Sequence, residues 1–270
     1  MNTHDTLTVR ELYDALDRLI PRSLSLAGDN DGLMVCPDPG APVEGILFAL
    51  DATEDVVRAA AERGCNVIIS HHPMIFRGVK AVDGHDTVTR KIVTLAKENI
   101  AVMSFHTRLD TVAGGVNDVL AHTLGLQDVT PFGDASNEAH APIGRVGNLA
   151  DPMTLAEFVR RVKDALDAPS VAYADAGRPV HRVAVLGGAG DDDVSLAALT
   201  GADTYVTGEL RYHNLCDAPY GSVNLIAAGH YHTEIPVHAS VTDMIRRVYG
   251  DAGKPCPKVE VLPACNIQYV

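Results

Sequence analysis

The chain has 270 residues, enough for one large or two modest domains, and its 46% hydrophobic and 21% charged residues are typical of a globular protein. No apolar run reaches the roughly 18 residues that a membrane span needs, and a net charge of −13 argues against a surface that binds nucleic-acid phosphates. Five scattered cysteines without a CxxC pair argue against a disulfide framework or a thiolate zinc site, and the N-terminus lacks a secretory signal pattern. We therefore expect a cytoplasmic protein.

The first half of the sequence alternates between the apolar patterns of helices and strands. A helix is predicted over residues 8–20, where Thr8 and Glu11 form a capping-box pattern. The elements that follow are predicted strands at 46–51, 66–70 and 101–105 and predicted helices at 53–64, 86–100 and 114–125. Because strands that alternate with helices of this length form parallel βαβ units, we predict an α/β fold with a sheet covered on both faces.

Residues 126–142 carry no periodicity and predict a connection with a domain boundary. The pattern then resumes with a capped helix at 154–167, where Thr154 and Glu157 repeat the capping-box spacing. The remaining predicted elements are strands at 144–149, 170–174, 181–188, 204–208, 224–228 and 258–264 and helices at 193–201 and 234–250. The two halves are therefore expected to be α/β units of similar make-up.

Three of the predicted strands end in side chains that commonly bind metals. These are His71 and His72 after strand 66–70, His106 and Asp110 after strand 101–105, and His230, His232 and Glu234 after strand 224–228. In open parallel sheets, ligands bind outside the carboxyl ends of the strands. If the three strands share one parallel sheet, the three clusters lie along one edge and can converge on a single site.

Five of these side chains are candidate metal ligands, namely His71, His72, Asp110, His230 and Glu234. Imidazoles and carboxylates without thiolates suit Zn²⁺, Mn²⁺, Fe²⁺, Ni²⁺ or Co²⁺, and the sequence leaves the identity of the metal open. A single catalytic zinc uses about three protein ligands, so five ligands predict two divalent ions that share a carboxylate. Any one of these histidines alone is more often a packing or capping residue, and only the three clusters together favour a metal centre.

Two prolines shape this prediction. Pro73 ends ordinary sheet pairing, so the adjacent imidazoles of His71 and His72 can diverge from one corner toward two different metals. Pro236 prefers the first turn of a helix, which predicts that Glu234 stands at a helix start and does not share one helical face with His230. That spacing distinguishes the site from an HExxH protease.

One glycine-rich stretch, VLGGAG at 185–190, also follows a predicted strand. It matches neither the phosphate-binding P-loop nor the GxGxxG pattern. Two interpretations stay open: a loop that approaches a phosphate, or a tight turn between a strand and a helix.

Seven stretches form a recognisable series along nearly the whole chain: DNDGLMV (29–35), ALDATEDVV (49–57), IISHHPMIF (68–76), FHTRLDTVAGGVND (105–118), VLGGAG (185–190), TGELRYH (207–213) and GHYHTE (229–234). In this order they resemble the Nif-three-like dinuclear metal centre proteins, a family also labelled GTP cyclohydrolase I type-two homologues. The resemblance implies the Nif-three-like fold, in which two interlinked α/β domains form a dinuclear metal site at the carboxyl ends of their strands. We assign residues 1–128 and 224–270 to the metal-binding domain and residues 129–223 to the second domain.

The resemblance also implies partners and an activity. The chain is expected to associate with itself as a homohexamer, a trimer of dimers, and to bind two divalent ions through the five ligands already named. By resemblance it is a metal-dependent hydrolase that opens the imidazole ring of GTP with metal-activated water, and His106 and His232 are then the residues expected to transfer protons. Two alternatives stay open: a phosphoesterase acting on a nucleotide-like small molecule, and a non-enzymatic hexamer that binds metal or a regulatory partner.

Overall fold

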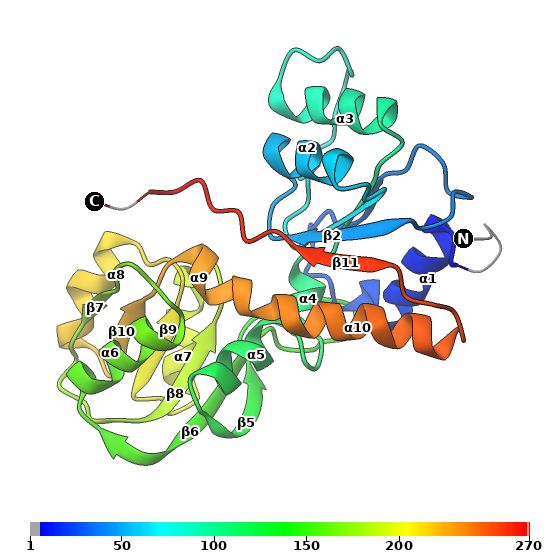
Figure 1. The fold of residues 1–270 in the computed structure, drawn as a ribbon. Helices are drawn as coiled ribbons and strands as arrows, with labels where there is room; N and C mark the ends of the chain where they lie inside the picture. The colour runs from blue at the N-terminus through cyan, green and yellow to red at the C-terminus, as the bar shows by residue number, and fades with distance from the viewer. Residues whose placement is uncertain (1–5, 269) are drawn as a thin grey trace. The chain divides into compact units, whose positions relative to one another are not determined.

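The computed structural model describes residues 6–268 and Val270. These residues form two compact units, and Figure 1 labels many of their helices and strands. Unit 1 contains the chain up to Leu109 together with His238–Ala264, and unit 2 contains Asp110–Val237 together with the residues from Cys265 onward. The chain therefore enters unit 2 after Leu109, returns to unit 1 after Val237, and leaves it again after Ala264.

Unit 1 is built on a five-stranded mixed sheet. Its strand order is β1-β4-β3-β2-β11, and the strands are β1 (Gly32–Val35), β2 (Gly45–Ala49), β3 (Val67–Ser70), β4 (Ala101–Ser104) and β11 (Lys258–Val261). The last four run parallel to their neighbours, whereas β1 lies antiparallel to β4 at one edge. The parallel βαβ pattern predicted from the first half is thus confirmed in the centre of this sheet.

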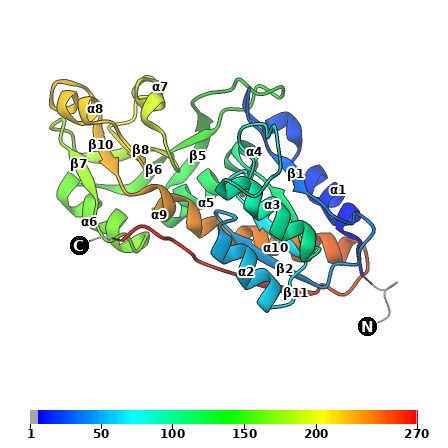
Figure 2. The same cartoon turned by 90° about the horizontal axis from the view of Figure 1, so that it is seen from above.

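Helices cover both faces of the unit 1 sheet. They are α1 (Val9–Leu19), α2 (Glu54–Glu62), α3 (Thr87–Lys97) and α10 (His238–Asp251), with a short 3₁₀ turn η1 (Arg22–Leu24). Figures 1 and 2 show α2 and α3 on one face and α1 and α10 on the other. Apolar side chains of α2 and α3, among them Val56 and Leu95, pack on Leu47, Ile68 and Val102 of the strands. This packing is the hydrophobic core that fixes the ends of β3 and β4.

Unit 2 is built on a six-stranded mixed sheet. Its strand order is β5-β6-β8-β9-β10-β7, and the strands are β5 (Gln127–Phe132), β6 (Gly144–Met153), β7 (Ala172–Ala174), β8 (Val180–Leu186), β9 (Thr204–Thr207) and β10 (Asn224–Ala227). Only β8, β9 and β10 are parallel, and β5, β6 and β7 pair antiparallel with their neighbours. The three parallel strands end in register, with Leu186 opposite Thr207 and Thr207 opposite Ala227.

The helices of unit 2 are short. They are α4 (Thr107–Thr111), which spans the unit boundary, α5 (Val116–Thr123), α6 (Leu155–Ala165), α7 (Val194–Leu199), α8 (Tyr212–Asp217) and α9 (His230–Glu234), with 3₁₀ turns η2 (Asp191–Asp193), η3 (Ala218–Tyr220) and η4 (Ile235–Val237). Leu120 of α5 and Phe158 of α6 pack against Val185, Val206 and Ile226 of the central strands. These contacts form a second core, separate from that of unit 1.

The predicted helix starts are confirmed in detail. Thr8 and Thr154 each accept the main-chain N–H of the glutamate three residues on, and each glutamate side chain accepts the threonine's own N–H. Helix α5 is followed by Gly125 with φ +75°, a left-handed conformation that suits glycine at a helix end.

Three predictions about organisation differ from the structure. The predicted domain boundaries after residues 128 and 223 lie elsewhere, because α5 packs on the unit 2 sheet and β10 pairs with β9 and β7 of that sheet. The three strands that end in polar clusters do not share one sheet, since β3 and β4 belong to unit 1 and β10 to unit 2. The connection predicted over 126–142 contains β5, an exposed edge strand in which Pro131 is tolerated.

Candidate metal centre

Each unit carries candidate ligands at the carboxyl edge of its own parallel strands. In unit 1, β3 and β4 end in register, with Ser70 opposite Ser104 and their hydroxyl oxygens 2.8 Å apart. Ser70 also donates its hydroxyl to the carbonyl of His72 at 2.9 Å, which fixes the turn that follows the strand. His71, His72 and His106 therefore leave the sheet at one edge, as the sequence predicted for these two clusters. We call these three side chains the unit 1 half-site.

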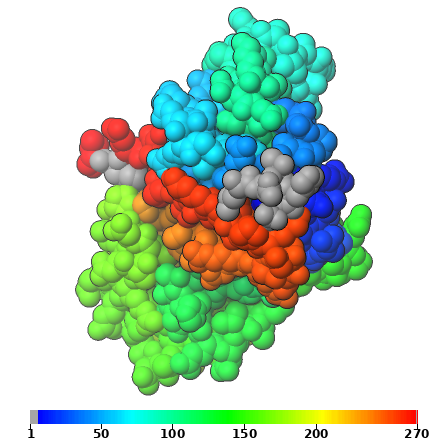
Figure 3. Space-filling view, turned by 45° about the vertical axis from the view of Figure 1, so that its right-hand side comes forward, coloured from blue at the N-terminus to red at the C-terminus, as the bar shows by residue number. Residues whose placement is uncertain are grey.

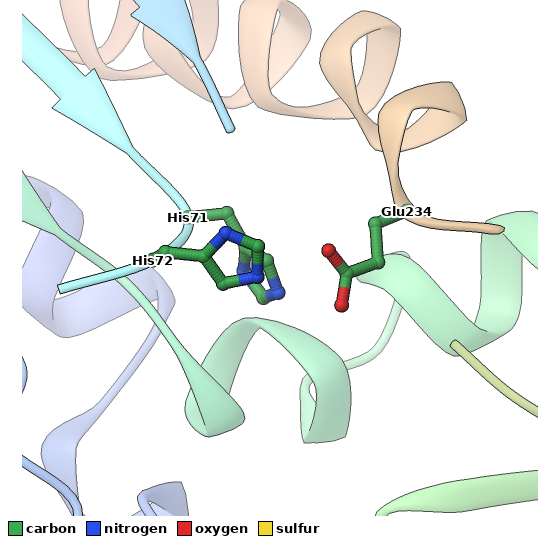
Figure 4. Close-up of side chains that lie close together, drawn as sticks. All are labelled: His71, His72 and Glu234. Atoms are coloured by element: carbon green, nitrogen blue, oxygen red, sulfur yellow. The ribbon is translucent and has the colours of Figure 1, made fainter. Parts of the chain in front are cut away.

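The two adjacent histidines are both held through Nδ1. The Nδ1 atom of His71, whose side chain is buried, lies 3.0 Å from the carbonyl oxygen of Phe105. The Nδ1 atom of His72 lies 3.0 Å from Oδ1 of Asp51, the residue that ends the predicted strand 46–51. A carbonyl or carboxylate oxygen only accepts, so both Nδ1 atoms carry the proton and both Nε2 atoms keep the lone pair that binds metals. Figure 4 shows the two rings leaving the end of β3.

His106 is paired with a buried carboxylate. Its Nδ1 atom lies 2.8 Å from Oδ1 of Asp29, and Thr107 donates both its hydroxyl (2.6 Å) and its main-chain N–H (3.2 Å) to Oδ2. Burial of Asp29 acts to raise its pKa, but the hydrogen bonds from His106 and Thr107 outweigh it and lower the pKa from the usual 3.8 to about 2. The His106 ring lies 5.5 Å from the His71 ring and 5.8 Å from the His72 ring, measured between centroids.

A buried arginine anchors the helix that begins after His106. Arg108 is fully buried, donates to Asp17 at 2.6 Å and to the carbonyl of Ile20 at 2.9 Å, and lies 3.0 Å from Oδ2 of Asp31. Its guanidinium also lies 4.5 Å from the centroid of the Phe105 ring. These contacts hold α4 to unit 1 and so fix the main chain on either side of His106.

In unit 2, His230 and Glu234 lie one turn apart on α9. The Nε2 atom of His230 lies 3.1 Å from Oε1 of Glu234, and its Nδ1 atom lies 3.1 Å from Oε1 of Glu209, which follows β9. The prediction that Glu234 does not share a helical face with His230 is therefore wrong. Pro236 falls within the 3₁₀ turn η4, after α9 has ended, so it does not interrupt the helix. Together with Asp110, these two side chains form the unit 2 half-site.

Glycines let the main chain approach these two side chains. A Cβ atom added at Gly188, whose φ is +69°, would collide with Oε1 of Glu234 and lie 3.1 Å from Nε2 of His230. A Cβ atom at Gly208 would lie 2.7 Å from the Cα atom of His230. The VLGGAG stretch is thus a turn between β8 and η2 that makes room for the imidazole and the carboxylate, as the tight-turn interpretation predicted.

Asp110 is buried and is the first residue of unit 2. Asn117 donates to the carbonyl of Asp110 at 3.3 Å and to that of Ile143 at 3.0 Å, and it accepts the N–H of Gly187 at 2.8 Å. One buried amide thereby joins α4 and α5 to the glycine turn beside His230 and Glu234.

His232 is placed differently. It lies two residues from both His230 and Glu234 on α9, and side chains at that spacing point away from each other on a helix. Its ring contacts Tyr231 edge-on, with centroids 5.3 Å apart.

Sequence reasoning missed the carboxylates that hold the histidines, namely Asp29, Asp51 and Glu209. The signal was present for two of them, because Asp51 and Glu209 stand just after strands β2 and β9, as the histidines stand after β3 and β10. A single acidic residue after a strand is common on protein surfaces, so the pattern alone does not single it out.

The donor set suits a divalent cation. His71, His72 and Glu234, drawn in Figure 4, are side chains of the kind that could hold a metal ion. Within unit 2, a lone pair on Nε2 of His230 facing the Glu234 carboxylate at 3.1 Å is repulsive unless a proton or a cation lies between the two atoms. The chemistry of these residues therefore fits a metal of the type predicted.

Comparison with known proteins places the chain in a family. The model of the Duf34/NIF3 (NGG1p interacting factor 3) family matches residues 7–256. The chain belongs to the Duf34/NIF3 family. A member from Clostridium acetobutylicum, named GTP cyclohydrolase 1 type 2 homolog, is 37% identical over 264 residues, 97% of each chain. The match over the full length confirms the family resemblance seen in the motifs.

Comparison with solved structures confirms the fold. A hypothetical protein of Staphylococcus aureus has a TM-score of 0.88 at 28% identity and covers 98% of this chain and all of its own. A Bacillus cereus protein related to NIF3 has the same TM-score at 24% identity, with 98% and 99% covered. The α/β fold with two mixed sheets is therefore that of NIF3-like proteins. Among the helices of residues 6–268, none is both long and apolar enough to cross a membrane.

Proposed function

We propose that this NIF3 protein is a metal-dependent hydrolase in which His71, His72, Asp110, His230 and Glu234 bind divalent ions. One observation carries the proposal: each of the three histidines is held through Nδ1 by an oxygen of its own unit, which leaves Nε2 as the atom that can bind a metal. Histidines that serve only packing or capping have no need of this common orientation.

The candidate ligands of unit 2 lie near the two points where the chain enters and leaves that unit. Asp110 is the first residue of unit 2. Glu234 lies three residues before Val237, after which the chain returns to unit 1. The candidate ligands of unit 2 are therefore close along the chain to the points where the two units are joined. His106, at the edge of unit 1, precedes Asp110 by a single turn of α4.

Five ligands with two carboxylates suit two ions better than one. Three neutral imidazoles and two carboxylates match Zn²⁺, Mn²⁺, Fe²⁺, Ni²⁺ or Co²⁺. A divalent cation in such a set supplies Lewis acidity to substrate and water.

His106 is the better supported of the two residues predicted to transfer protons. Its Nδ1–H is held by Asp29, so Nε2 can accept a proton, and the ionised Asp29 stabilises the imidazolium that results. His232 points away from His230 and Glu234 along α9, so its part in the reaction rests on the family resemblance alone.

The name of the Clostridium acetobutylicum relative suggests the reaction. We propose hydrolytic opening of the purine imidazole ring of a nucleotide, with water as the nucleophile and His106 as the group that moves the proton. Hydrolysis of a phosphoester in a nucleotide-like substrate uses the same residues and is the second candidate. The non-enzymatic alternative is a homohexamer, a trimer of dimers, that binds metal or a regulatory partner.

The first test is metal content. Wild-type protein purified with excess Mn²⁺, Zn²⁺ or Fe²⁺ in turn should retain about two ions per chain by elemental analysis. The variants His71→Ala and Asp110→Ala should lose most of this metal, whereas His122→Ala, at an exposed histidine of α5, should retain it. Metal content near zero in the wild-type protein after metal-replete purification would refute the proposal.

The second test separates the reactions. Metal-loaded protein is incubated with GTP, and formate and inorganic phosphate are measured together with the mass of the particle by light scattering. Formate that His106→Ala abolishes while retaining metal supports ring opening, and phosphate without formate supports the phosphoesterase. Neither product from a metal-loaded particle of about six chains supports the binding role.

A further inference from the structure

The segment that follows the histidine pair forms an open cavity of about 620 Å³ in unit 1. Its lining comes entirely from residues 73–89, the loop between β3 and α3 and the first turn of that helix. Figure 3 shows this turquoise segment at the surface. Pockets for small molecules usually measure roughly 300–1,000 Å³, so the volume suits a ligand of nucleotide size.

The cavity begins where the unit 1 half-site ends. Pro73 and Met74, the residues directly after His72, contribute to its wall. The loop is held to the preceding part of unit 1, because the side-chain amide of Asn30 donates to the carbonyl of Ile75 at 2.5 Å. A ligand in the cavity would therefore lie beside the candidate metal ligands.

An exposed aromatic ring stands at this junction. Phe76 lines the cavity and is 57% exposed, although a phenylalanine of this size is normally buried. Its ring meets the ring of His106 edge-on, with centroids 6.3 Å apart and an angle of 86°. Because more than half of its surface is exposed, Phe76 still has area available for stacking against a planar ring.

Two cationic side chains of the cavity are not engaged by carboxylates. Arg77 and Lys80 are exposed, and neither forms an ion pair with any residue that the structure describes. The two carboxylates of the lining are engaged by main-chain N–H groups: Asp83 accepts that of His85 at 2.9 Å, and Asp86 accepts those that open α3.

Asp86 is thus the N-cap of α3, and Asp83 stabilises the turn before it. The hydrogen bond from the N–H of Thr89 is the main reason why the pKa of Asp86 is lowered. The cations, in contrast, have heads that only solvent or a ligand can satisfy.

We propose that this cavity, which we call the loop 73–89 cavity, binds the substrate, and that the substrate is a small molecule with a planar ring and phosphate groups. Phe76 stacks on the ring, and Arg77 and Lys80 bind the phosphate groups. The inference rests on the proposed function for the chemistry performed at the metal centre, but ligand binding in the cavity needs only residues of the loop itself.

The experiment measures binding and metal content separately. Calorimetric titrations of metal-loaded full-length protein use GTP, guanosine and tripolyphosphate as probes, and each is repeated after metal removal with a chelator. Guanosine and tripolyphosphate should each bind more weakly than GTP. The double variant Arg77→Ala/Lys80→Ala should weaken GTP binding by about tenfold or more, and Phe76→Ala by about tenfold, with metal content unchanged.

Matched controls separate these contacts from general charge and aromatic effects. Lys97→Ala removes an exposed lysine at the far end of α3, and Tyr220→Ala removes an exposed aromatic ring in unit 2. Both should bind GTP like the wild-type protein. Because Arg77, Lys80 and Phe76 are exposed, their variants should fold, and circular dichroism checks this.

The outcomes distinguish this inference from the proposed function. Metal-loaded protein that binds none of the three probes, or binds GTP equally well in the loop variants, overturns the inference and leaves the metal centre standing. Loop-dependent GTP binding by wild-type protein that retains no metal even after metal-replete purification supports the inference and refutes the metal-dependent hydrolase. Loop variants that change only the particle mass by light scattering assign the loop to a contact between copies of the chain and overturn the inference.

Discussion

The two half-sites orient histidines in the same way but support them by different means. In unit 1, His71 and His72 come from one turn after β3, and a main-chain carbonyl and Asp51 fix their rings. In unit 2, His230 stands on a short helix against a glycine turn, where any larger residue at position 188 would collide with Glu234. Both half-sites therefore use hydrogen-bond partners, and that of unit 2 depends in addition on the close approach of the main chain at a glycine.

The largest effect is expected from filling that space. Gly188→Ala places a Cβ atom against the Glu234 carboxylate and the His230 ring, so the variant should lose most of its bound metal. Gly201→Ala is the matched control, because Gly201 also has positive φ (+77°) but nothing within 4 Å of the added atom. Both should lose about 1–2 kcal/mol of stability from the left-handed conformation. Elemental analysis and thermal unfolding measure the two effects, and equal metal content in the two variants would contradict the steric account.

A smaller effect is expected from removing the carboxylates that orient the rings. Asp51→Ala frees Nδ1 of His72 in unit 1, and Glu209→Ala frees Nδ1 of His230 in unit 2. Each should lower metal affinity by about tenfold, since such partners fix the ring and its tautomer. Competition with a chromogenic chelator measures the affinities, with Glu62→Ala at an exposed position of α2 as the control. If the unit 2 half-site depends more on the glycine turn than on this hydrogen bond, Glu209→Ala should lose less metal affinity than Asp51→Ala. A larger loss in Glu209→Ala would show that the hydrogen bond matters more in unit 2.

Asp29 gives unit 1 a pH dependence of stability. Its folded pKa of about 2 lies below the usual 3.8, so the ionised carboxylate stabilises the folded state, and this contribution is present above pH 3.8 and is lost as the pH falls toward 2. The contribution is about 2 kcal/mol, at roughly 1.4 kcal/mol for each pKa unit. Urea unfolding of metal-free protein across this range should show the loss in the wild-type protein but not in Asp29→Asn. The same loss in both proteins would assign the acid sensitivity to other groups, and Asp243→Asn on the exposed face of α10 is the control.

Much of both half-sites could be predicted because strand ends are readable in the sequence. Apolar strands that alternate with helices predict parallel pairing, and parallel pairing brings His71 and His106 to one edge whatever the rest of the fold is. What the alternation does not contain is the sheet that each strand joins. Residues 224–228 look like another strand of the first sheet, yet the hydrogen bonds of β10 with β9 and β7 place it in unit 2.

The remaining errors come from local signals that are weaker than tertiary contacts. Pro236 suggested that Glu234 stands at the start of a helix, but a helix of five residues can end before a 3₁₀ turn that contains the proline. Strand β5 is exposed along most of its length, and its sequence has no apolar alternation that would predict a strand. Its extended conformation is instead supported by antiparallel pairing with β6. The role of Asp51 and Glu209 could not be predicted, because it depends on their hydrogen bonds to histidine rings that are distant in the sequence.

The smallest effect is expected where the two units use the same device. Thr8 and Thr154 cap α1 and α6 with the same reciprocal hydrogen bonds, and neither helix carries a candidate ligand. Thr8→Ala and Thr154→Ala should each cost about 1 kcal/mol of stability, and Thr→Ser at either position should restore most of it because the hydroxyl is kept. Urea unfolding measures the loss, and metal content should stay unchanged in all four variants. If a cap variant lost as much metal as Gly188→Ala, metal binding in unit 2 would depend on overall stability. The space beside His230 and Glu234 would then not be the deciding factor.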